Sequence, residues 1–231
     1  MRLAIIPARG GSKRIPRKNV RPFCGKPMLA WSVEAARASA CFDRIVVSTD
    51  DPDISQVARG CGAEVPFIRP PSLSDDHTPT VPVIQHAIQW YAQQGMAASY
   101  VCCIYATAPF VTAEDLRRGF AALNDSGSQF AVSVTTYAFP IQRALRLTAA
   151  GRIRMVNPEN LNVRSQDLEE TYHDAGQFYW GRAAGWLAGA PLLGGEAVPV
   201  ILPRHRVQDI DTPEDWARAE AMFKSLQPLG E

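Results

Sequence analysis

Short apolar runs alternate with helical patterns along most of this 231-residue chain. The apolar runs suit buried strands, while the segments between them repeat apolar residues at the spacing of one helix face. Strands are expected at 3–7, 44–49, 64–68, 100–105 and 130–135, and helices at 28–39, 53–60, 81–94 and 112–123. This alternation predicts an α/β fold, a doubly wound, mostly parallel sheet flanked by helices. In such a sheet, ligands bind beyond the carboxyl ends of the strands.

The alternating pattern weakens between about residues 139 and 173. Five arginines and three asparagines fall in this stretch without a long apolar period. We expect a small inserted lobe or dimer-contact segment here that carries part of the site, the alternative being a purely structural surface excursion. Regular patterns resume with strands at 177–180 and 198–202 and a final helix at 213–226. With 46% hydrophobic residues the chain can build one sizeable core, so we expect a single domain over 1–231.

A glycine-rich and cation-rich loop, Ala8 to Asn19, directly follows the first expected strand. Residues 1–33 contain no acid and hold eight of the chain's 24 cations, so the remainder carries 16 cations against 23 acids. The loop offers accessible backbone N–H groups, a hydroxyl and fixed positive charge, which come from Gly10, Gly11, Ser12, Arg9, Lys13 and Lys18. A loop of this kind after a buried strand predicts a site for a triphosphate or for departing pyrophosphate.

Other uses of a basic loop fit this sequence less well. The loop matches neither the Walker A pattern nor the G-x-G-x-x-G dinucleotide pattern. A nucleic-acid surface normally combines a broad basic face with interleaved aromatic residues, and neither extends beyond Lys26. We therefore expect no nucleic-acid partner, and the alternative of a solvated surface loop remains.

Composition also bounds the environment of the protein. No run of eighteen apolar residues exists, and the N-terminus lacks the hydrophobic stretch of a signal peptide. The five cysteines are odd in number and form no C-x-x-C pair, which disfavours both a disulfide framework and a zinc site. We expect reduced thiols, a cytoplasmic location and no membrane partner.

A pair of carboxylates near the C-terminus is the first candidate for binding a metal. Asp209 and Asp211 flank Ile210, and on an extended segment residues two apart share a face. Mg²⁺ prefers oxygen ligands and uses one or two carboxylates beside phosphates and water. The spacing fits equally well a helix-start cap at Asp211 and a solvated Asp209. Asp50-Asp51 is a second candidate, although turn formation at Asp51-Pro52 explains that pair as well.

Several ordered motifs in the chain resemble one enzyme family. Ala8 to Lys13, then Lys18-Asn19, then Gly25 to Pro27 resemble the N-terminal signature of sugar-acid cytidylyltransferases. Enzymes of this family transfer CMP from CTP to nonulosonic acids, as in the synthesis of CMP-sialic acid. The resemblance continues to Asp209 to Thr212, so it spans nearly the whole chain. It implies a nucleotidyltransferase-like fold and a cytidylyltransferase activity.

The resemblance also implies roles for individual residues. It makes Arg9, Lys18 and Asp211 catalytic, with Mg²⁺ or Mn²⁺ held by Asp209 and Asp211. CTP is the implied co-substrate, and the residues implied to bind it are Ala8, Gly10, Gly11, Ser12, Lys13, Asn19, Arg69, Thr80, Tyr105 and Thr107. At position 105 the chain departs from the family, which has a base-contacting glutamine there. Tyr105 either stacks, donates its hydroxyl or packs in the core.

The departures resemble the pseudaminic acid branch of the family, in the segments Tyr105–Phe110, Phe139–Ala144, Arg164–Leu168 and Tyr172–Tyr179. This implies a nine-carbon 2-keto acid sugar, pseudaminic acid, as the acceptor, and we expect a homodimer. The implied acceptor-binding residues are Arg164, Gln166, Tyr172, His173, Gln177 and Phe178. His173 is alternatively a general base or a plain hydrogen-bonding residue.

The resemblance leaves other functions open. The same transfer to N-acetylneuraminate, legionaminate or a keto-deoxy-octulosonate is one alternative. A nucleotide-binding regulatory protein that kept the fold and lost the reaction is another, from a different functional class.

Overall fold

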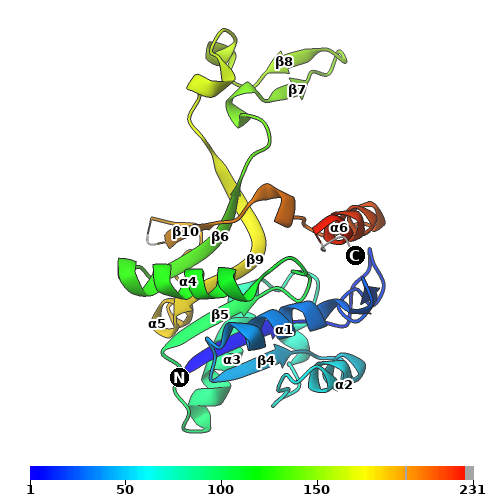
Figure 1. The fold of residues 1–231 in the computed structure, drawn as a ribbon, viewed down its shortest axis with the longest axis vertical. Coiled ribbons are helices and arrows are strands. Elements are labelled where there is room, and N and C mark those ends of the chain that lie inside the picture. The colour runs from blue at the N-terminus through cyan, green and yellow to red at the C-terminus, as the bar shows by residue number, and fades with distance from the viewer. Residues whose placement is uncertain (196, 227–231) are drawn as a thin grey trace, which may run out of the picture.

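The computed structural model describes residues 1–195 and 197–226. Its centre is a six-stranded sheet in the order β10-β6-β9-β5-β1-β4 (Figure 1). These strands are β1 (Arg2–Pro7), β4 (Arg44–Ser48), β5 (Tyr100–Ile104), β6 (Phe130–Thr136), β9 (Tyr172–Arg182) and β10 (Ala197–Ile201). β1 pairs in parallel with β4 and β5, and β10 in parallel with β6, whereas β9 runs antiparallel between β5 and β6. The predicted mostly parallel α/β sheet is confirmed.

Helices cover both faces of this sheet. They are α1 (Met28–Ser39), α2 (Pro52–Gly60), α3 (Thr80–Gln93), α4 (Ala113–Ser126), α5 (Ala183–Leu187) and α6 (Pro213–Leu226). The alternation of β1 explains the two layers, since Ala4 and Ile6 pack against α1, α2 and α4, while Leu3 and Ile5 pack against α3 and α5. A third apolar cluster joins α6 to the loop after β1, through Ile15, Phe23 and Trp216.

Side chains cap the N-terminal ends of α4 and α6. Thr112 and Asp115 make reciprocal contacts as a capping box at the start of α4. At the start of α6 the Thr212 hydroxyl accepts a hydrogen bond from the Asp215 backbone N–H at 3.2 Å. Two further short strands, β2 (Pro22–Phe23) and β3 (Lys26–Pro27), form a small hairpin before α1.

The strand expected at residues 64–68 is wrong. Only Glu64 makes a single parallel bridge, to Val46 of β4. Pro66 has no backbone N–H to give to a ladder, so the pairing stops after that bridge. The chain instead continues as an irregular segment to Arg69, which lies at the edge of the site described below.

A lobe projects from the sheet between β6 and β9, as expected for the stretch of weak pattern (Figure 1). It contains the antiparallel pair β7 (Leu145–Leu147) and β8 (Ile153–Met155). Short 3₁₀ turns complete the fold here and elsewhere: η1 (Pro71–Leu73), η2 (Ile141–Arg143), η3 (Pro158–Asn160), η4 (Ser165–Asp167) and η5 (Arg204–Arg206). Large apolar side chains are exposed on the lobe, including Phe139 at 83% and Leu147 at 78%. Among the described helices, none has the length and apolar character needed to cross a bilayer.

Candidate functional site

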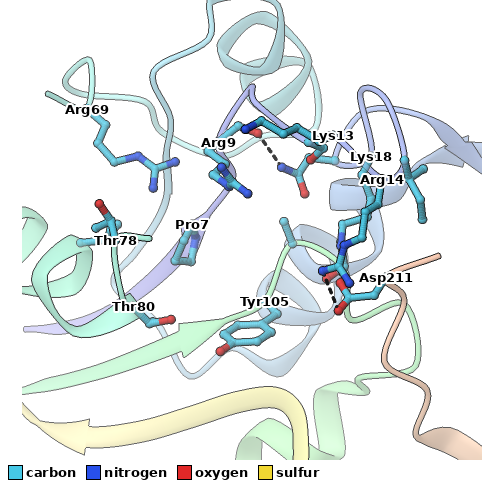
Figure 2. Close-up of a pocket in the computed structure, with 16 residues that line it drawn as sticks. Pro7, Arg9, Lys13, Arg14, Lys18, Arg69, Thr78, Thr80, Tyr105 and Asp211 are labelled. Atoms are coloured by element: carbon cyan, nitrogen blue, oxygen red, sulfur yellow. Dashed lines mark hydrogen bonds and ion pairs between the residues drawn. The ribbon is translucent and has the colours of Figure 1, made fainter. Parts of the chain in front are cut away.

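A cavity of about 260 Å³ lies at the carboxyl end of β1, where the cationic loop leaves the sheet. Most of the predicted nucleotide site lines it: Arg9, Ser12, Lys13, Lys18, Asn19, Arg69, Thr80, Tyr105, Thr107 and Asp211. Figure 2 shows Arg69, Thr78 and Thr80 on one side, Lys18, Arg14 and Asp211 on the other, and Tyr105 below. We call this cavity the phosphate pocket. Its lining is dominated by cations, which suits a polyphosphate.

Three residues of the predicted nucleotide loop do not line the phosphate pocket. Ala8 is buried, and its backbone N–H is bound to the Ser48 carbonyl at 2.9 Å. The Gly10 N–H is already taken, because it donates to the Asp50 carboxylate at 3.0 Å. A Cβ at Gly10 would lie 2.6 Å from the Asp51 carboxylate, so this glycine is required by packing and not by phosphate approach. Gly11 is also absent from the lining.

One carboxylate, Asp76, holds two cations of the phosphate pocket. Arg9 and Lys13 both form ion pairs with Asp76. The hydrogen bond from Lys13 and, to a smaller extent, the one from Arg9 lower the pKa of Asp76 to about 2. Asp76 follows Asp75, whose carboxylate accepts the backbone N–H groups of His77 and Thr78 and so fixes the turn. No local pattern could reveal this pairing, since Arg9 and Asp76 are 67 residues apart.

Two further cations of the loop, Lys18 and Arg14, contact Asp211. Lys18 Nζ donates to the Ile210 carbonyl at 2.7 Å and to Asp211 Oδ1 at 3.3 Å. Arg14 Nη2 lies 2.9 Å from Asp211 Oδ2 (Figure 2). The predicted catalytic residues Lys18 and Asp211 are therefore in direct contact, although 193 residues separate them in sequence.

The two carboxylates proposed as metal ligands fit a hard divalent cation. Ile210 between them is 1% exposed, as the extended-segment argument predicts. Asp211 lines the phosphate pocket, and Asp209 lines the next one. Burial and the negative charge of Asp211 raise the pKa of Asp209, and a bound cation would relieve that repulsion. Among the described residues no cluster of three His, Cys, Asp or Glu side chains exists, so an ion held by these two carboxylates would need phosphates and water as further ligands, as Mg²⁺ prefers.

Arg69 is a buried arginine with unused hydrogen-bond donors. Its side chain is 4% exposed, and its Nε and Nη2 have no hydrogen-bond partner among the described residues. The nearest carboxylate, Asp50, is 3.9 Å from Nη2, which is too long for a hydrogen bond. Burial lowers the pKa of Arg69, yet a guanidinium stays charged at neutral pH. A desolvated cation that lines the phosphate pocket favours an anionic ligand there.

A second cavity, of about 540 Å³, adjoins the phosphate pocket and shares Tyr105 with it. We call it the acceptor pocket. Its lining consists of Tyr105, His173, Asp174, Ala175, Gly176, Tyr179, Val207, Gln208 and Asp209. The Tyr179 hydroxyl donates to the Asp174 carboxylate at 2.7 Å. Burial raises the pKa of Tyr105, so its hydroxyl stays protonated and can serve as a donor in the site.

Of the predicted acceptor residues, only His173 lines the acceptor pocket. Its Nδ1 lies 2.8 Å from the Asp174 carbonyl oxygen, which can only accept, so Nδ1 carries the proton. Tyr172, which precedes it, is 41% exposed and donates its hydroxyl to Glu170 at 2.6 Å. Tyr172 does not line the acceptor pocket.

Gln177 and Phe178, which are predicted to bind the acceptor, are both buried and do not line the acceptor pocket. Phe178 is fully buried on the face of β9 that packs against α4, within contact of Gly119. Gln177 is 3% exposed, and its Nε2 donates to the Arg206 carbonyl at 2.5 Å. The sequence run Tyr172 to Tyr179 is one long strand, so its side chains divide between the pocket and the core.

Arg164 and Gln166 lie on the projecting lobe and not in the acceptor pocket of their own chain. Gln166 lines a separate hollow of about 280 Å³ at the base of the lobe, together with Tyr137 and Phe139. Their predicted contact with the acceptor therefore stays a prediction, and within one chain the acceptor pocket does not include them. Sequence proximity to His173 is misleading here, because the chain turns back into the sheet only at β9.

The chain is similar in sequence to known proteins over nearly its full length. Residues 3–183 match the profile of a family described as Cytidylyltransferase. The pseudaminic acid cytidylyltransferase of Campylobacter jejuni is 41% identical over 222 residues, which cover 96% of this chain and 96% of that protein. The CMP-N,N'-diacetyllegionaminic acid synthase of Legionella pneumophila is 32% identical and covers 97% of both chains.

A solved structure supports the fold. CMP:2-keto-3-deoxy-manno-octonic acid synthetase complexed with CTP matches with a TM-score of 0.71 over 98% of this chain and 99% of that chain. The two sequences are 16% identical, so this likeness concerns the architecture alone.

Proposed function

The chain belongs to the cytidylyltransferase family, and we propose that it transfers CMP from CTP to the anomeric hydroxyl of a nonulosonic acid, pseudaminic acid. Pyrophosphate is the second product. The observation that carries this proposal is the pair of adjoining pockets, one cationic and sized for phosphates, the other lined by hydrogen-bonding groups. The relative from Campylobacter jejuni, with 41% identity, supports pseudaminic acid among the possible acceptors.

The reaction needs positioning and charge neutralisation more than covalent catalysis. The anomeric hydroxyl loses its proton to solvent as its oxygen attacks the α-phosphorus of CTP, a new P–O bond forms, and the bond to pyrophosphate breaks. Arg9, Lys13 and Lys18 stand where they can stabilise the charge that grows on the pyrophosphate. Arg9 and Lys13 exchange the Asp76 carboxylate for phosphate oxygens when CTP binds.

The proposal includes Mg²⁺, or Mn²⁺, held by Asp209 and Asp211. When bound, such an ion neutralises phosphate charge and lowers the pKa of a coordinated hydroxyl. A bound cation would balance part of the negative charge of Asp211. Lys18 and Arg14, which pair with Asp211, would then be free to bind phosphate oxygens. The proposal also includes a cytoplasmic location, which the free thiols Cys24, Cys41, Cys61, Cys102 and Cys103 support.

An assay of pyrophosphate release with CTP and a panel of nonulosonic acids tests the function. We expect pseudaminate to react with a kcat/KM more than about tenfold above that of N-acetylneuraminate, a difference of about 1.4 kcal/mol. A site with buried polar groups discriminates strongly against a sugar that leaves them unpaired. Equal use of both sugars would contradict the pseudaminate assignment and leave the transfer of CMP standing.

Other acceptors and a loss of activity are the remaining outcomes of this assay. Reaction with legionaminate or a keto-deoxy-octulosonate alone would replace the acceptor. If no sugar reacts while titration calorimetry records CTP binding, the chain is a nucleotide-binding regulatory protein and the proposed activity is wrong.

We further propose that the protein is a homodimer formed through the lobe between β6 and β9. The lobe exposes apolar side chains that no other described part of the chain covers: Phe139, Leu145, Leu147, Ile153 and Leu161. It also carries Arg164 and Gln166, which the family resemblance places in an acceptor site. A second copy of the chain would both cover the apolar surface and bring these residues to a pocket.

Replacement of Leu147 by aspartate is expected to turn the dimer into a monomer, because a buried unpaired charge opposes the contact. Sedimentation velocity of the purified protein measures the change. The control is Ala150→Asp, which adds the same charge at the exposed turn of the β7–β8 hairpin. A wild-type chain that sediments as a monomer, or a Leu147→Asp variant that stays dimeric, would contradict this interface.

A further inference from the structure

The segment that carries the two proposed metal ligands has no regular secondary structure. Val207 to Asp211 connects η5 to α6 without joining a helix or a strand. No ladder of backbone hydrogen bonds therefore sets the positions of Asp209 and Asp211. A metal site needs its ligands held to within a fraction of an ångström, so other contacts must supply the order.

An ion pair between a buried carboxylate and a partly buried arginine holds the first end of this segment. The Arg206 guanidinium grips Asp115 with two parallel hydrogen bonds, Nη1 to Oδ2 at 2.5 Å and Nη2 to Oδ1 at 3.1 Å. Arg206 Nη1 also donates to the Phe110 carbonyl at 3.3 Å. Asp115 is 1% exposed and closes the capping box of α4 with Thr112, so the carboxylate is itself fixed to a helix end. A planar fork bound on two sides leaves Arg206 little freedom to rotate.

Further contacts hold the backbone of the segment. The buried Gln177 amide donates to the Arg206 carbonyl at 2.5 Å, which ties η5 to β9. At the other end the Asp215 carboxylate accepts the N–H groups of Asp211, at 3.2 Å, and Thr212, at 2.9 Å. Within the segment, Lys18 Nζ donates a hydrogen bond to the Ile210 carbonyl. The segment from Val207 to Asp211 is thus held at one end by the N-terminal end of α4 and at the other by the N-terminal end of α6.

We propose that Asp115 and Arg206 are a positioning pair for the proposed reaction, which sets the location of Asp209 and Asp211 and thereby the affinity of the site for its divalent cation. This inference rests on the metal assignment made under the proposed function. A buried ion pair is a weak source of stability, because its desolvation cost offsets most of its attraction. The role of the Asp115–Arg206 pair is therefore to fix the position of the segment from Val207 to Asp211.

The test measures Mn²⁺ binding in the presence of CTP and without acceptor sugar, by electron paramagnetic resonance. Asp115→Asn keeps the shape of the side chain and removes its charge. Loss of a partner that orients a metal ligand typically weakens metal affinity by about ten- to hundredfold, and we expect an increase of that size in the Kd for Mn²⁺. Binding of CTP without metal, followed by calorimetry, should stay within about twofold, since Asp115 does not line the phosphate pocket.

Arg118→Ala is the matched control. Arg118 also pairs with Asp115, at 3.4 Å, but its side chain is 46% exposed and it lies on α4 itself. We expect its Mn²⁺ affinity to equal that of the wild type. Arg206→Lys provides a second variant if Asp115→Asn fails to fold, because it keeps the charge and loses the fork, and it should weaken Mn²⁺ binding as well.

A folded Asp115→Asn protein with a lower melting temperature and unchanged Mn²⁺ affinity would overturn the positioning role and leave a structural ion pair. Unchanged Mn²⁺ affinity in Arg206→Lys would do the same. If the wild-type protein binds CTP but no Mn²⁺, the metal assignment of the proposed function fails first, which separates the two failures.

Discussion

Replacement of Asp211 by alanine is expected to lower turnover by about three orders of magnitude or more while leaving the fold intact. A metal ligand contributes several kcal/mol of transition-state stabilisation, and each 1.36 kcal/mol is about tenfold in rate. Asp211 is the carboxylate that faces the phosphate pocket, and Lys18 and Arg14 both contact it. The variant frees those two cations, so its binding of CTP without metal should be preserved or strengthened.

Mg²⁺-dependent release of pyrophosphate from CTP and pseudaminate measures this effect. Circular dichroism confirms the fold of the variant. The control is Glu214→Ala, which removes a neighbouring carboxylate whose ion-pair partner is the exposed Arg218. Near-normal Mg²⁺-dependent activity of Asp211→Ala would rule out the metal assignment at this residue.

Replacement of Arg9 by alanine is expected to reduce the rate by about two orders of magnitude or more, the scale seen when one preorganised charge-stabilising donor is removed. Arg9 lies at the carboxyl end of β1, and Asn19 Nδ2 donates to its backbone carbonyl at 2.9 Å. This contact fixes the backbone of the loop at Arg9, from which the guanidinium reaches the phosphate pocket. The loss should appear in kcat, because charge on the leaving group grows only in the transition state.

Steady-state kinetics with CTP as the varied substrate measure the loss. Arg2→Ala serves as the control, since Arg2 is a cation at the opposite end of β1, where it pairs with Asp43. A variant at Arg9 that loses thermal stability but keeps its kcat would make Arg9 a structural residue and not a catalytic one.

The elements and the phosphate-binding character of the site were readable from local patterns. Apolar runs such as Leu3 to Pro7 and the capping pair Thr112 and Asp115 act over a few residues, so their outcome does not depend on the rest of the fold. The same holds for the cationic loop, because Arg9, Lys13 and Lys18 lie within ten residues of one another and follow one strand. A single parallel strand end brings such a loop to the ligand-binding edge of the sheet.

Contacts across the chain were not readable in this way. The pairing of Arg9 with Asp76, and of Asp115 with Arg206, depends on which segments the sheet order brings together. The failed strand at residues 64–68 had the right apolar residues, but Pro66 lacked the N–H that a neighbour would need. Patterns of hydrophobicity carry no information about such partners.

Local chemistry therefore determined the α/β architecture, the helix starts and the kind of ligand that this chain binds, because hydrophobic period and charge act over short distances. Tertiary structure decided which residues share a pocket. The long strand β9 sends Tyr179 toward the acceptor pocket and Phe178 into the core, and the lobe carries Gln166 away from both pockets. Neighbours in sequence separate in this way because strand side chains alternate between faces, and because a lobe inserted between two strands leaves the sheet before it returns.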